Sequence, residues 1–279
     1  MTTQLTNEGW SNGTDGRWTT RQDRVRDSEE GIRLSGRFKA NTLDGDDIIY
    51  GSSEKINGLS ISGSLKTGAG NDLVRGVSDQ ASGLYNENTI NTGFENDTII
   101  GSSANYRGLE NQGNIFSGDG DDLIVGKSLT QEGITNSGYL DMGSGNDILR
   151  GIGVLAALRN DDYISMGKGS DTVDVRRGGL DGNGYLYMGP GFDQLIGFGP
   201  QTVDGGGDRD SLFLKQGKYK IADNTDEWGY TYGKTIKDKS GTSMVAISFE
   251  SIGSILSGEE VNLKNGTLLI NAMGEVSYL

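Results

Sequence analysis

Hydrophobic residues occupy three fixed positions in a unit that repeats along most of this 279-residue chain, usually at intervals of 22 to 25 residues. The first position holds Ile49, Val74, Ile99, Ile124, Leu149, Val173, Leu195 and Leu212. The second holds Leu65, Ile90, Ile115, Leu140, Ile164, Leu186 and Val203. The third holds Leu59, Leu84, Leu109, Ile134, Leu158 and Leu180. Three apolar positions per unit, separated by short polar runs, predict an all-β fold, a three-walled parallel β-solenoid with about 25 residues per coil.

Other patterns argue against helices and set the limits of the solenoid. No apolar period of 3.6 residues persists, and a glycine inside a helix costs about 1 kcal/mol. The chain nevertheless contains 47 glycines, many of them inside the repeat. The repeat covers residues 31–214, and two inserted residues in the first coil would bring Ile32 and Phe38 into the hydrophobic columns.

The segments that flank the repeat have different patterns. Residues 1–30 show no repeat, and we expect them to form an N-terminal cap or an assembly segment, because an uncovered end coil exposes an open strand edge. Residues 215–279 contain alternating runs that predict a small antiparallel β cap. In this cap Asn265-Gly266 predicts a two-residue hairpin between residues 261–263 and 267–270.

An aspartate follows each second hydrophobic position by seven residues and closes a glycine-rich phrase such as Gly118-Asp-Gly-Asp-Asp122. Calcium binds six to eight oxygens, which are commonly carboxylates and backbone carbonyls, and glycine permits the dihedral angles that turn carbonyls toward one point. Stacked loops of this kind predict one column of Ca²⁺ ions between adjacent coils. The predicted ligands are Asp47, Asp72, Asp97, Asp122, Asp147, Asp171, Asp193 and Asp210, with Gly45, Gly68, Gly70, Gly93, Gly118, Gly120, Gly143, Gly145, Gly167, Gly169, Gly189 and Gly191, and with Asn71 and Glu95.

Two other interpretations concern the polar columns. The aspartates could instead cap backbone amides, as Asp-Gly turns do in solenoids that bind no calcium. A second polar column lies eleven residues before the aspartates and consists of Asn86, Asn111, Asn136 and Asn160. Asparagine tolerates the left-handed backbone that a corner needs, so we interpret this column as a structural turn ladder.

Composition excludes several classes of function. The net charge of −14 makes binding to nucleic acid or to an anionic membrane unfavourable. The absence of cysteine and histidine excludes disulfides, thiolate or imidazole metal sites and Ser-His-Asp triads. No run approaches 18 apolar residues, so no membrane span is expected. The N-terminal residues lack the basic and apolar regions of a cleavable secretion signal.

From about Leu43 to Leu214 the glycine–aspartate phrases resemble the hemolysin-type calcium-binding repeat, or RTX, family, whose unit is Gly-Gly-x-Gly-x-Asp-x-apolar-x. The 25-residue version is similar to cyanobacterial secreted proteins, including oscillin-like surface-fibril types. The resemblance implies export by a type I channel through an uncleaved C-terminal signal, followed by folding on extracellular calcium. Leu43, Glu95 and Asp208 depart from the family by standing where it has glycine, and each coil has one loop instead of two.

Three functions remain open from the sequence. The first is a secreted, non-enzymatic structural protein that self-assembles head-to-tail into a filament, sheath or layer. The second is an adhesin or a module that binds cell-surface polysaccharide. The third is a polysaccharide lyase of the β-helix kind, for which the nearest set of residues is Asp162, Asp174, Arg176 and Arg177. Arginine is a poor base because its pKa is very high, so we expect no enzymatic activity.

Overall fold

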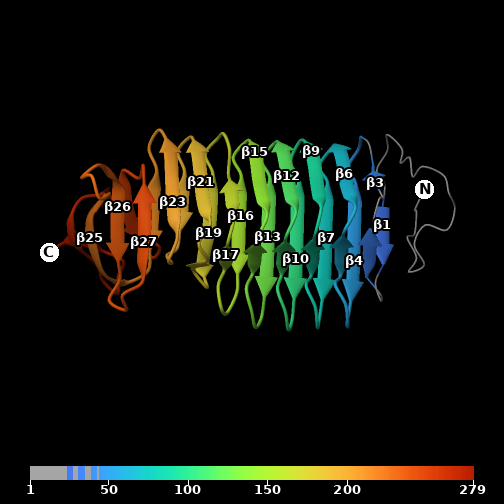
Figure 1. Cartoon of the computed structure of the whole chain (residues 1–279), viewed down its shortest axis with the longest axis horizontal. Coiled ribbons are helices and arrows are strands. Elements are labelled where there is room, and N and C mark those ends of the chain that lie inside the picture. The colour runs from blue at the N-terminus through green and yellow to red at the C-terminus, as the bar shows by residue number, and fades with distance from the viewer. Residues whose placement is uncertain (1–23, 28–30, 35–38, 43) are drawn as a thin grey trace.

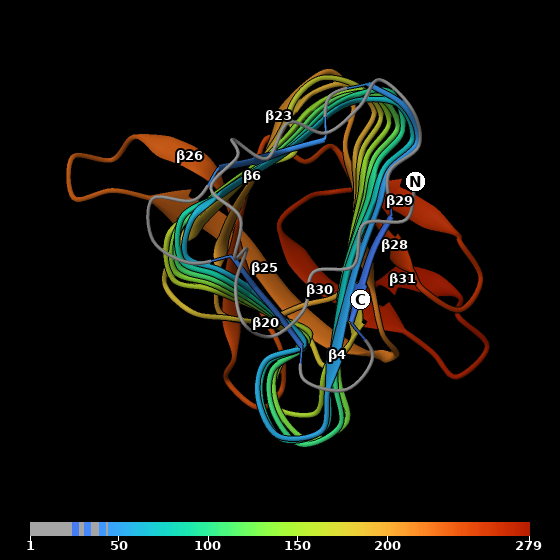
Figure 2. The same cartoon turned by 90° about the vertical axis from the view of Figure 1, so that its right-hand side faces the viewer.

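The computed structural model describes residues 24–27, 31–34, 39–42 and 44–279. These residues form strands and no helix, and the strands stack into an elongated rod (Figure 1). Viewed along the rod, successive coils superpose on one three-sided outline (Figure 2). The described residues therefore confirm the predicted all-β parallel solenoid.

Three sheets form the walls of the rod, and we name them sheets A, B and C. Sheet A contains, in spatial order, β1 (Arg24–Asp27), β4 (Ile48–Ser53), β7 (Leu73–Ser78), β10 (Thr98–Ser103), β13 (Leu123–Ser128), β16 (Ile148–Ile152), β19 (Thr172–Arg177), β22 (Gln194–Ile196), β24 (Ser211–Leu214), β28 (Ser251–Ser254) and β29 (Glu260–Asn262). Sheet C contains β2 (Ile32–Leu34), β5 (Leu59–Ile61), β8 (Leu84–Asn86), β11 (Leu109–Asn111), β14 (Ile134–Asn136), β17 (Leu158–Asn160) and β20 (Leu180–Asp181).

Sheet B is the longest wall and continues into the C-terminal region. It contains, in spatial order, β3 (Lys39–Asn41), β6 (Ser64–Ala69), β9 (Thr89–Phe94), β12 (Asn114–Asp119), β15 (Tyr139–Ser144), β18 (Tyr163–Ser165), β21 (Tyr185–Pro190), β23 (Thr202–Gly207), β27 (Ser243–Ile247), β26 (Thr231–Lys237), β25 (Gly217–Thr225), β30 (Gly266–Ile270) and β31 (Val276–Tyr278).

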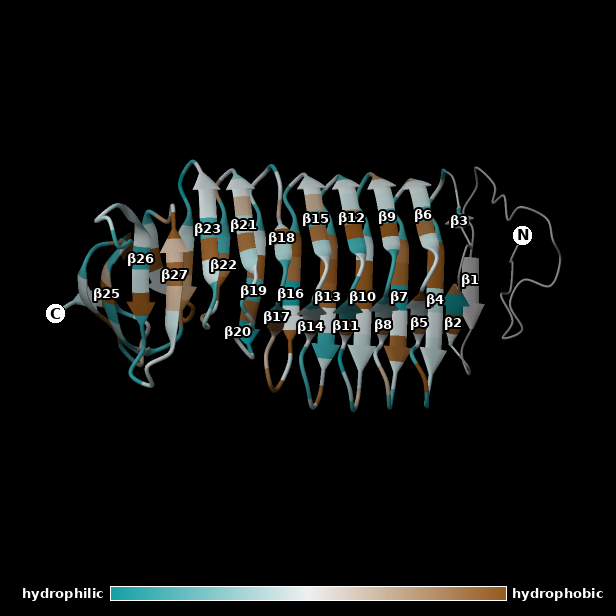
Figure 3. Ribbon diagram, in the orientation of Figure 1, coloured by the Kyte–Doolittle hydropathy of each residue, from teal (hydrophilic) through white to brown (hydrophobic). Residues whose placement is uncertain are grey.

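The hydrophobic columns set the register of these walls. Ile99 pairs with Val74 on one side and with Ile124 on the other, and the same alignment recurs through the solenoid. All three side chains point inward and are almost completely buried. Burial of one such aliphatic side chain contributes about 1.5–3 kcal/mol. Because each coil adds a rung to every column, hydrophobic bands cross neighbouring strands at matching heights (Figure 3).

The first coil departs from the predicted columns at one position. Ile32 pairs with Leu59 and is buried, as predicted. In the second column, however, Ala40 pairs with Leu65, so the assignment of Phe38 to that column was wrong. Phe38 itself lies outside the described residues, as does most of the predicted N-terminal segment. Within that segment β1 pairs with β4 in the solenoid register.

Antiparallel strands cover the C-terminal end of the rod. Strands β27 and β28 still add to the walls in parallel, whereas β25, β26, β29, β30 and β31 pair antiparallel. Strands β25 and β30 cross the end of the solenoid (Figure 2), and Ile221, Ile236 and Leu268 join its core. The predicted Asn265-Gly266 hairpin was wrong: β29 pairs with β28 in sheet A, and β30 pairs with β25 and β31 in sheet B.

Candidate functional site

The predicted aspartates lie at one corner of the rod, where each coil passes from a sheet B strand to the next sheet A strand. We call this turn the aspartate corner. The eight aspartates point into the rod and are at most 2% exposed. They stand directly before the sheet A strands, so the parallel pairing of those strands stacks them in register. The predicted loop glycines lie just before them, in the turns and at the ends of the sheet B strands.

One carboxylate oxygen of each aspartate from Asp72 to Asp210 has a defined structural role. The backbone N–H of each column aspartate donates to Oδ1 of the aspartate in the next coil; for Asp97 and Asp122 the distance is 2.7 Å. The same bond recurs at 2.7–2.9 Å from Asp47 to Asp193, and the N–H of Asp210 donates to Glu250 instead. The aspartates therefore do cap backbone amides.

The second carboxylate oxygen has no such partner. Oδ2 is buried and accepts no hydrogen bond from any described residue in seven consecutive members of the column, which are Asp72, Asp97, Asp122, Asp147, Asp171, Asp193 and Asp210. A buried polar atom without a partner costs about 1–3 kcal/mol, and more when it is charged. The repetition of one unpaired oxygen in coil after coil is the most unusual feature of the described structure.

Burial makes the charged form of these groups unfavourable. It raises the pKa of Asp97 and Asp147 to about 8, although the amide hydrogen bond to each carboxyl acts in the opposite direction. The same cause raises the pKa of Asp193 to about 7 and that of Asp122 to about 6. Neighbouring carboxylates add to the effect, because like charges that share a site disfavour ionisation.

The structure also explains the loop glycines without a metal. Gly118 has a φ of 118°, and a Cβ atom there would overlap the carbonyl oxygen of Gly93 in the previous coil. Glu95 and Asp208, which stand where the repeat has glycine, adopt the same left-handed region with φ of 69° and 74°. The glycine pattern is thus a requirement of close stacking as well as a feature of calcium loops.

Two of the predicted ligands lie outside the buried column. The backbone N–H of Asn71 donates to Asp46, and its side-chain oxygen accepts from the backbone N–H of Asn96. Glu95 is exposed, and its carboxylate accepts a hydrogen bond of 2.9 Å from the backbone N–H of Gly70. Asn71 belongs to an outer ladder in which each coil donates to the previous coil, opposite to the buried column. The bond to Glu95 is donated toward the following coil, as in the buried column.

Sequence reasoning missed a hydroxyl ladder next to the column. Thr67 donates to the carbonyl of Thr92, Thr92 to that of Ser117, and Ser117 to that of Met142, at 2.9–3.0 Å. These hydroxyls stand five residues before the aspartates, and the Thr92 hydroxyl is near enough to lower the pKa of Asp97 against the larger effect of burial. Its single proton is donated to the Ser117 carbonyl, so Oδ2 of Asp97 still has no donor. In later coils this position holds buried methionines, Met142, Met166 and Met188. The recurrence of small hydroxyl residues at one offset was the available signal.

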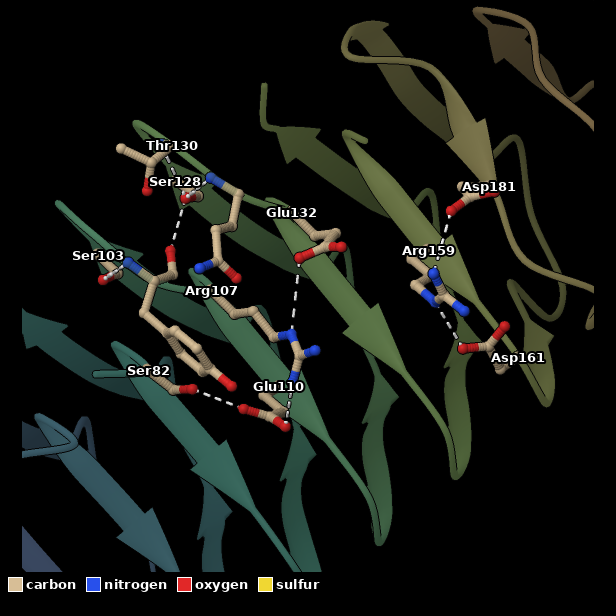
Figure 4. Close-up of polar contacts among 12 residues, drawn as sticks. Ser82, Ser103, Arg107, Glu110, Ser128, Thr130, Glu132, Arg159, Asp161 and Asp181 are labelled. Atoms are coloured by element: carbon tan, nitrogen blue, oxygen red, sulfur yellow. Dashed lines mark hydrogen bonds and ion pairs between the residues drawn. The ribbon is translucent and has the colours of Figure 1, made fainter. Parts of the chain in front are cut away.

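Two buried glutamates outside the column differ from its aspartates because an arginine pairs with them. Glu110 lies in β11 of sheet C, and Glu132 lies just before β14. Arg107 forms an ion pair of 2.8 Å with Glu110 and contacts Glu132 at 3.6 Å, while Ser82 donates to Glu110 (Figure 4). In contrast, no salt bridge to a column aspartate occurs among the described residues. The column is therefore a set of buried carboxylates that the described part of the chain does not neutralise.

A calcium ion at the aspartate corner would need six to eight oxygen ligands. Carboxylate oxygen is the ligand that calcium prefers, and each coil from Asp72 onward offers one buried oxygen without a partner. No three acidic side chains come together as a metal-binding group within the described ranges. The residues would fit only an ion that takes carboxylate oxygens from adjacent coils and completes its shell with backbone carbonyls of the loop glycines.

The proposed lyase set is only partly assembled. Asp174 contacts Arg176, and these two residues line one cavity with Arg177, Arg150, Gly151 and Ile152. Asp162 lies in the turn between β17 and β18 and does not line that cavity. The sequence analysis missed Arg150, which pairs with Asp174 across the parallel strands β16 and β19.

Comparisons with known proteins add no relative: no protein-family model, curated protein or solved structure matches the chain. No helix among the described residues is long and apolar enough to cross a membrane. The functional reading of the chain therefore depends on its own residues.

Proposed function

We propose that this chain is a non-enzymatic structural protein whose coils are held together by calcium at the aspartate corner. The observation that carries the proposal is the row of seven buried Oδ2 atoms without a partner. A divalent cation shared by adjacent coils would satisfy these oxygens and remove the repulsion between stacked carboxylates. The resemblance to RTX repeats and the net charge of −14 point in the same direction.

Calcium binding of this kind would couple folding to location. Binding that occurs only in the folded state contributes directly to the free energy of folding. Extracellular calcium modules commonly bind at about 10⁻⁴–10⁻³ M, so the sites would fill outside a cell and stay empty in the cytosol. A secreted or cell-surface protein exported through a C-terminal signal in residues 215–279 is the setting that suits this behaviour.

A calcium titration of the metal-stripped chain tests the proposal. We expect removal of calcium with EGTA to lower the temperature at which the far-UV circular dichroism signal of β structure is lost cooperatively, and added calcium to restore it. Magnesium should not substitute, because it requires a strict octahedron and keeps its waters. An unchanged unfolding temperature in excess EGTA, with no calcium bound by calorimetry, would contradict the proposal and favour protonation of the column instead.

Self-association is the second part of the proposal, and the rod shape supports it. Continuous head-to-tail stacking would need the walls to continue past the C-terminal end, where β25 and β30 cover the core. A head-to-tail contact would therefore join the N-terminal coil of one copy to the outside of this cap. Static light scattering with and without calcium tests assembly, and a calcium-loaded monomer at every concentration would refute it.

One observation favours the adhesin alternative. Trp228 and Tyr230 are 76% and 72% exposed in the turn of the β25–β26 hairpin, and Tyr232 is exposed near the start of β26. Exposed aromatic side chains provide apolar contact area for a partner such as a glycan. If the chain binds cell-surface polysaccharide, Trp228→Ala should abolish binding on a glycan array. The exposed Phe94→Ala in the solenoid is the matched control.

A further inference from the structure

A cavity of about 320 Å³ opens between β16 and β19, apart from the aspartate corner. It is lined by Arg150, Gly151, Ile152, Asp174, Arg176 and Arg177. Three arginines and one aspartate give this cluster a local formal charge of +2, although the whole chain carries −14. A concentrated positive charge in an acidic protein needs an explanation beyond solubility.

A local irregularity in the sheet brings two of these arginines together. Arg150 pairs with Asp174, but Ile152 pairs with Arg177, so the register shifts by one residue between the two pairs. In a regular strand consecutive side chains point to opposite faces, whereas a β-bulge re-aims one of them. Arg176 and Arg177 are consecutive, yet both are exposed and both line the cavity.

Asp174 holds two of the arginines in a particular way. Its Oδ1 accepts a hydrogen bond of 2.8 Å from Nε of Arg176, and its Oδ2 lies 3.3 Å from Nε of Arg150. Asp174 is almost completely buried, so it is a fixed anchor. Both arginines are bound through Nε, and no described residue accepts a hydrogen bond from their terminal Nη groups.

Arg177 is the third donor group. Its side chain forms no hydrogen bond or ion pair with any described residue, although it lies at the rim of the same cavity. A surface pair that served only stability would match one cation with one anion and contribute little. Here one anchored carboxylate orients a pair of guanidinium groups, and a third guanidinium beside them has no partner within the described structure.

We infer that this cavity binds an oxyanion, such as the carboxylate, sulfate or phosphate group of a small molecule or of an acidic sugar. Guanidinium groups match such anions because each presents parallel N–H donors to two oxygens. A carboxylate would offset half of the local charge of +2, and a doubly charged sulfate would offset all of it. The anion would not contact calcium, since none of the residues that line the cavity is a predicted calcium ligand, but the site needs the folded coils that calcium stabilises in the proposed function.

Anion titration by isothermal calorimetry tests the inference, with inorganic sulfate, inorganic phosphate, acetate and glucuronate as probes at constant ionic strength. We expect saturable binding of at least one probe, and a loss of affinity of about tenfold or more in Arg177→Gln, the change expected for one charge-assisted hydrogen bond. Preference for sulfate or phosphate would indicate a tetrahedral group, and preference for glucuronate over acetate an acidic sugar.

Arg159→Gln is the matched control. Arg159 is a surface arginine with a side chain 41% exposed, and it contacts Asp161 and Asp181 without lining the cavity (Figure 4). Its substitution should leave anion affinity unchanged. Because the Arg177 side chain forms no hydrogen bond or ion pair with any described residue, and its backbone pairing with Ile152 does not need that side chain, Arg177→Gln should keep the wild-type melting temperature in the absence of anions. No saturable binding, or an equal loss in both variants, would overturn the inference.

Discussion

Two corners of the same coil contain stacked, fully buried polar side chains, yet they satisfy their hydrogen bonds differently. At the asparagine corner, between sheets C and B, Nδ2 of Asn111 donates to Oδ1 of Asn136 at 2.7 Å and to the carbonyl of Tyr139 at 3.2 Å. The same pair of bonds recurs at Asn86 and, with distances up to 3.2 Å, at Asn136. An amide is both donor and acceptor, so this ladder is complete without any ligand.

An ionised carboxylate has only acceptors, so the aspartate ladder cannot complete itself. Oδ1 of Asp122 accepts the backbone N–H of Asp97, and Oδ2 has no donor among the described residues. Asparagine at this corner would supply a donor, yet all eight coils have aspartate. The first corner is therefore complete through stacking alone, whereas the second leaves one acceptor oxygen per coil that a proton or, as we propose, a calcium ion would satisfy.

We expect the largest effect when an asparagine of the asparagine corner is replaced by aspartate, the residue of the aspartate corner. In Asn111→Asp, an acceptor would face the Asn136 oxygen and the Tyr139 carbonyl, and a charge would be buried without a partner. We expect a loss of about 3–5 kcal/mol in the free energy of unfolding, measured by urea denaturation, with or without calcium. A loss that calcium restores would contradict the distinction between the corners.

The second-largest effect is expected in the pH dependence of the metal-free chain, because the aspartate corner can gain and lose protons and the asparagine corner cannot. Folding raises the pKa of Asp97 and Asp147 to about 8, so the folded state holds protons that the unfolded state releases near pH 4. Stability is therefore greatest at low pH and is lost as pH rises through the folded-state values, between about 6 and 8. We expect the metal-free melting temperature to fall by roughly 5 °C or more from pH 5 to pH 8.5.

Calcium provides the control for the pH experiment. Bound cations would replace the protons, so the fall in melting temperature should become small in millimolar calcium. A metal-free melting temperature that rises with pH over the same range would show that the column is stable while ionised, and that it needs neither protons nor metal.

The reciprocal substitution should have a smaller effect that depends on calcium. Asp122→Asn keeps an acceptor for the Asp97 amide and places a donor where Oδ2 has no partner. We expect it to be neutral or slightly stabilising in EGTA at pH 8, and to reduce the calcium-induced stabilisation by about 1–2 kcal/mol. Asp210→Asn, at the end of the column, should lose less. Equal losses in thermal denaturation with calcium would argue against ions shared between coils.

The hydroxyl ladder beside the column should contribute least. In Thr92→Val the carbonyl of Ser117 loses its donor, and the expected cost is about 1 kcal/mol in urea denaturation. Thr89→Val on the same strand is the matched control, because the Thr89 hydroxyl contacts only the exposed side chain of Asn88. Equal effects for the two variants would show that the buried ladder adds no stability of its own.

Features that depend on the repeat could be predicted from the sequence. A side chain at a fixed offset in every coil must stack on itself, which is why the three hydrophobic columns and the stacking of Asn86–Asn160 were predicted correctly. The expected reason for the asparagines was wrong, because they end sheet C strands and none adopts the left-handed backbone. Predictions for segments outside the repeat had no second copy of the same pattern to support them. The Asn265-Gly266 signal describes a local turn but does not determine which strand pairs with Val261, which adds to sheet A instead.

The candidate sites show the same limit. Arg150 and Asp174 each stand three residues after a column aspartate, so their contact follows from the period. The bulge that exposes both Arg176 and Arg177 occurs in a single coil, and no repeat signals it. The unpaired state of Oδ2 was also not predictable, because the spacing places a carboxylate at the corner without showing which neighbours donate to it.

Long-wavelength anomalous diffraction from crystals grown in millimolar calcium tests the aspartate corner most directly. We expect a row of calcium peaks between adjacent coils, each within about 2.3–2.6 Å of the Oδ2 atoms that lack a partner, and no peaks at the asparagine corner. An aspartate corner with no anomalous peak in well-ordered coils would contradict calcium binding and leave buried protons as what neutralises the column.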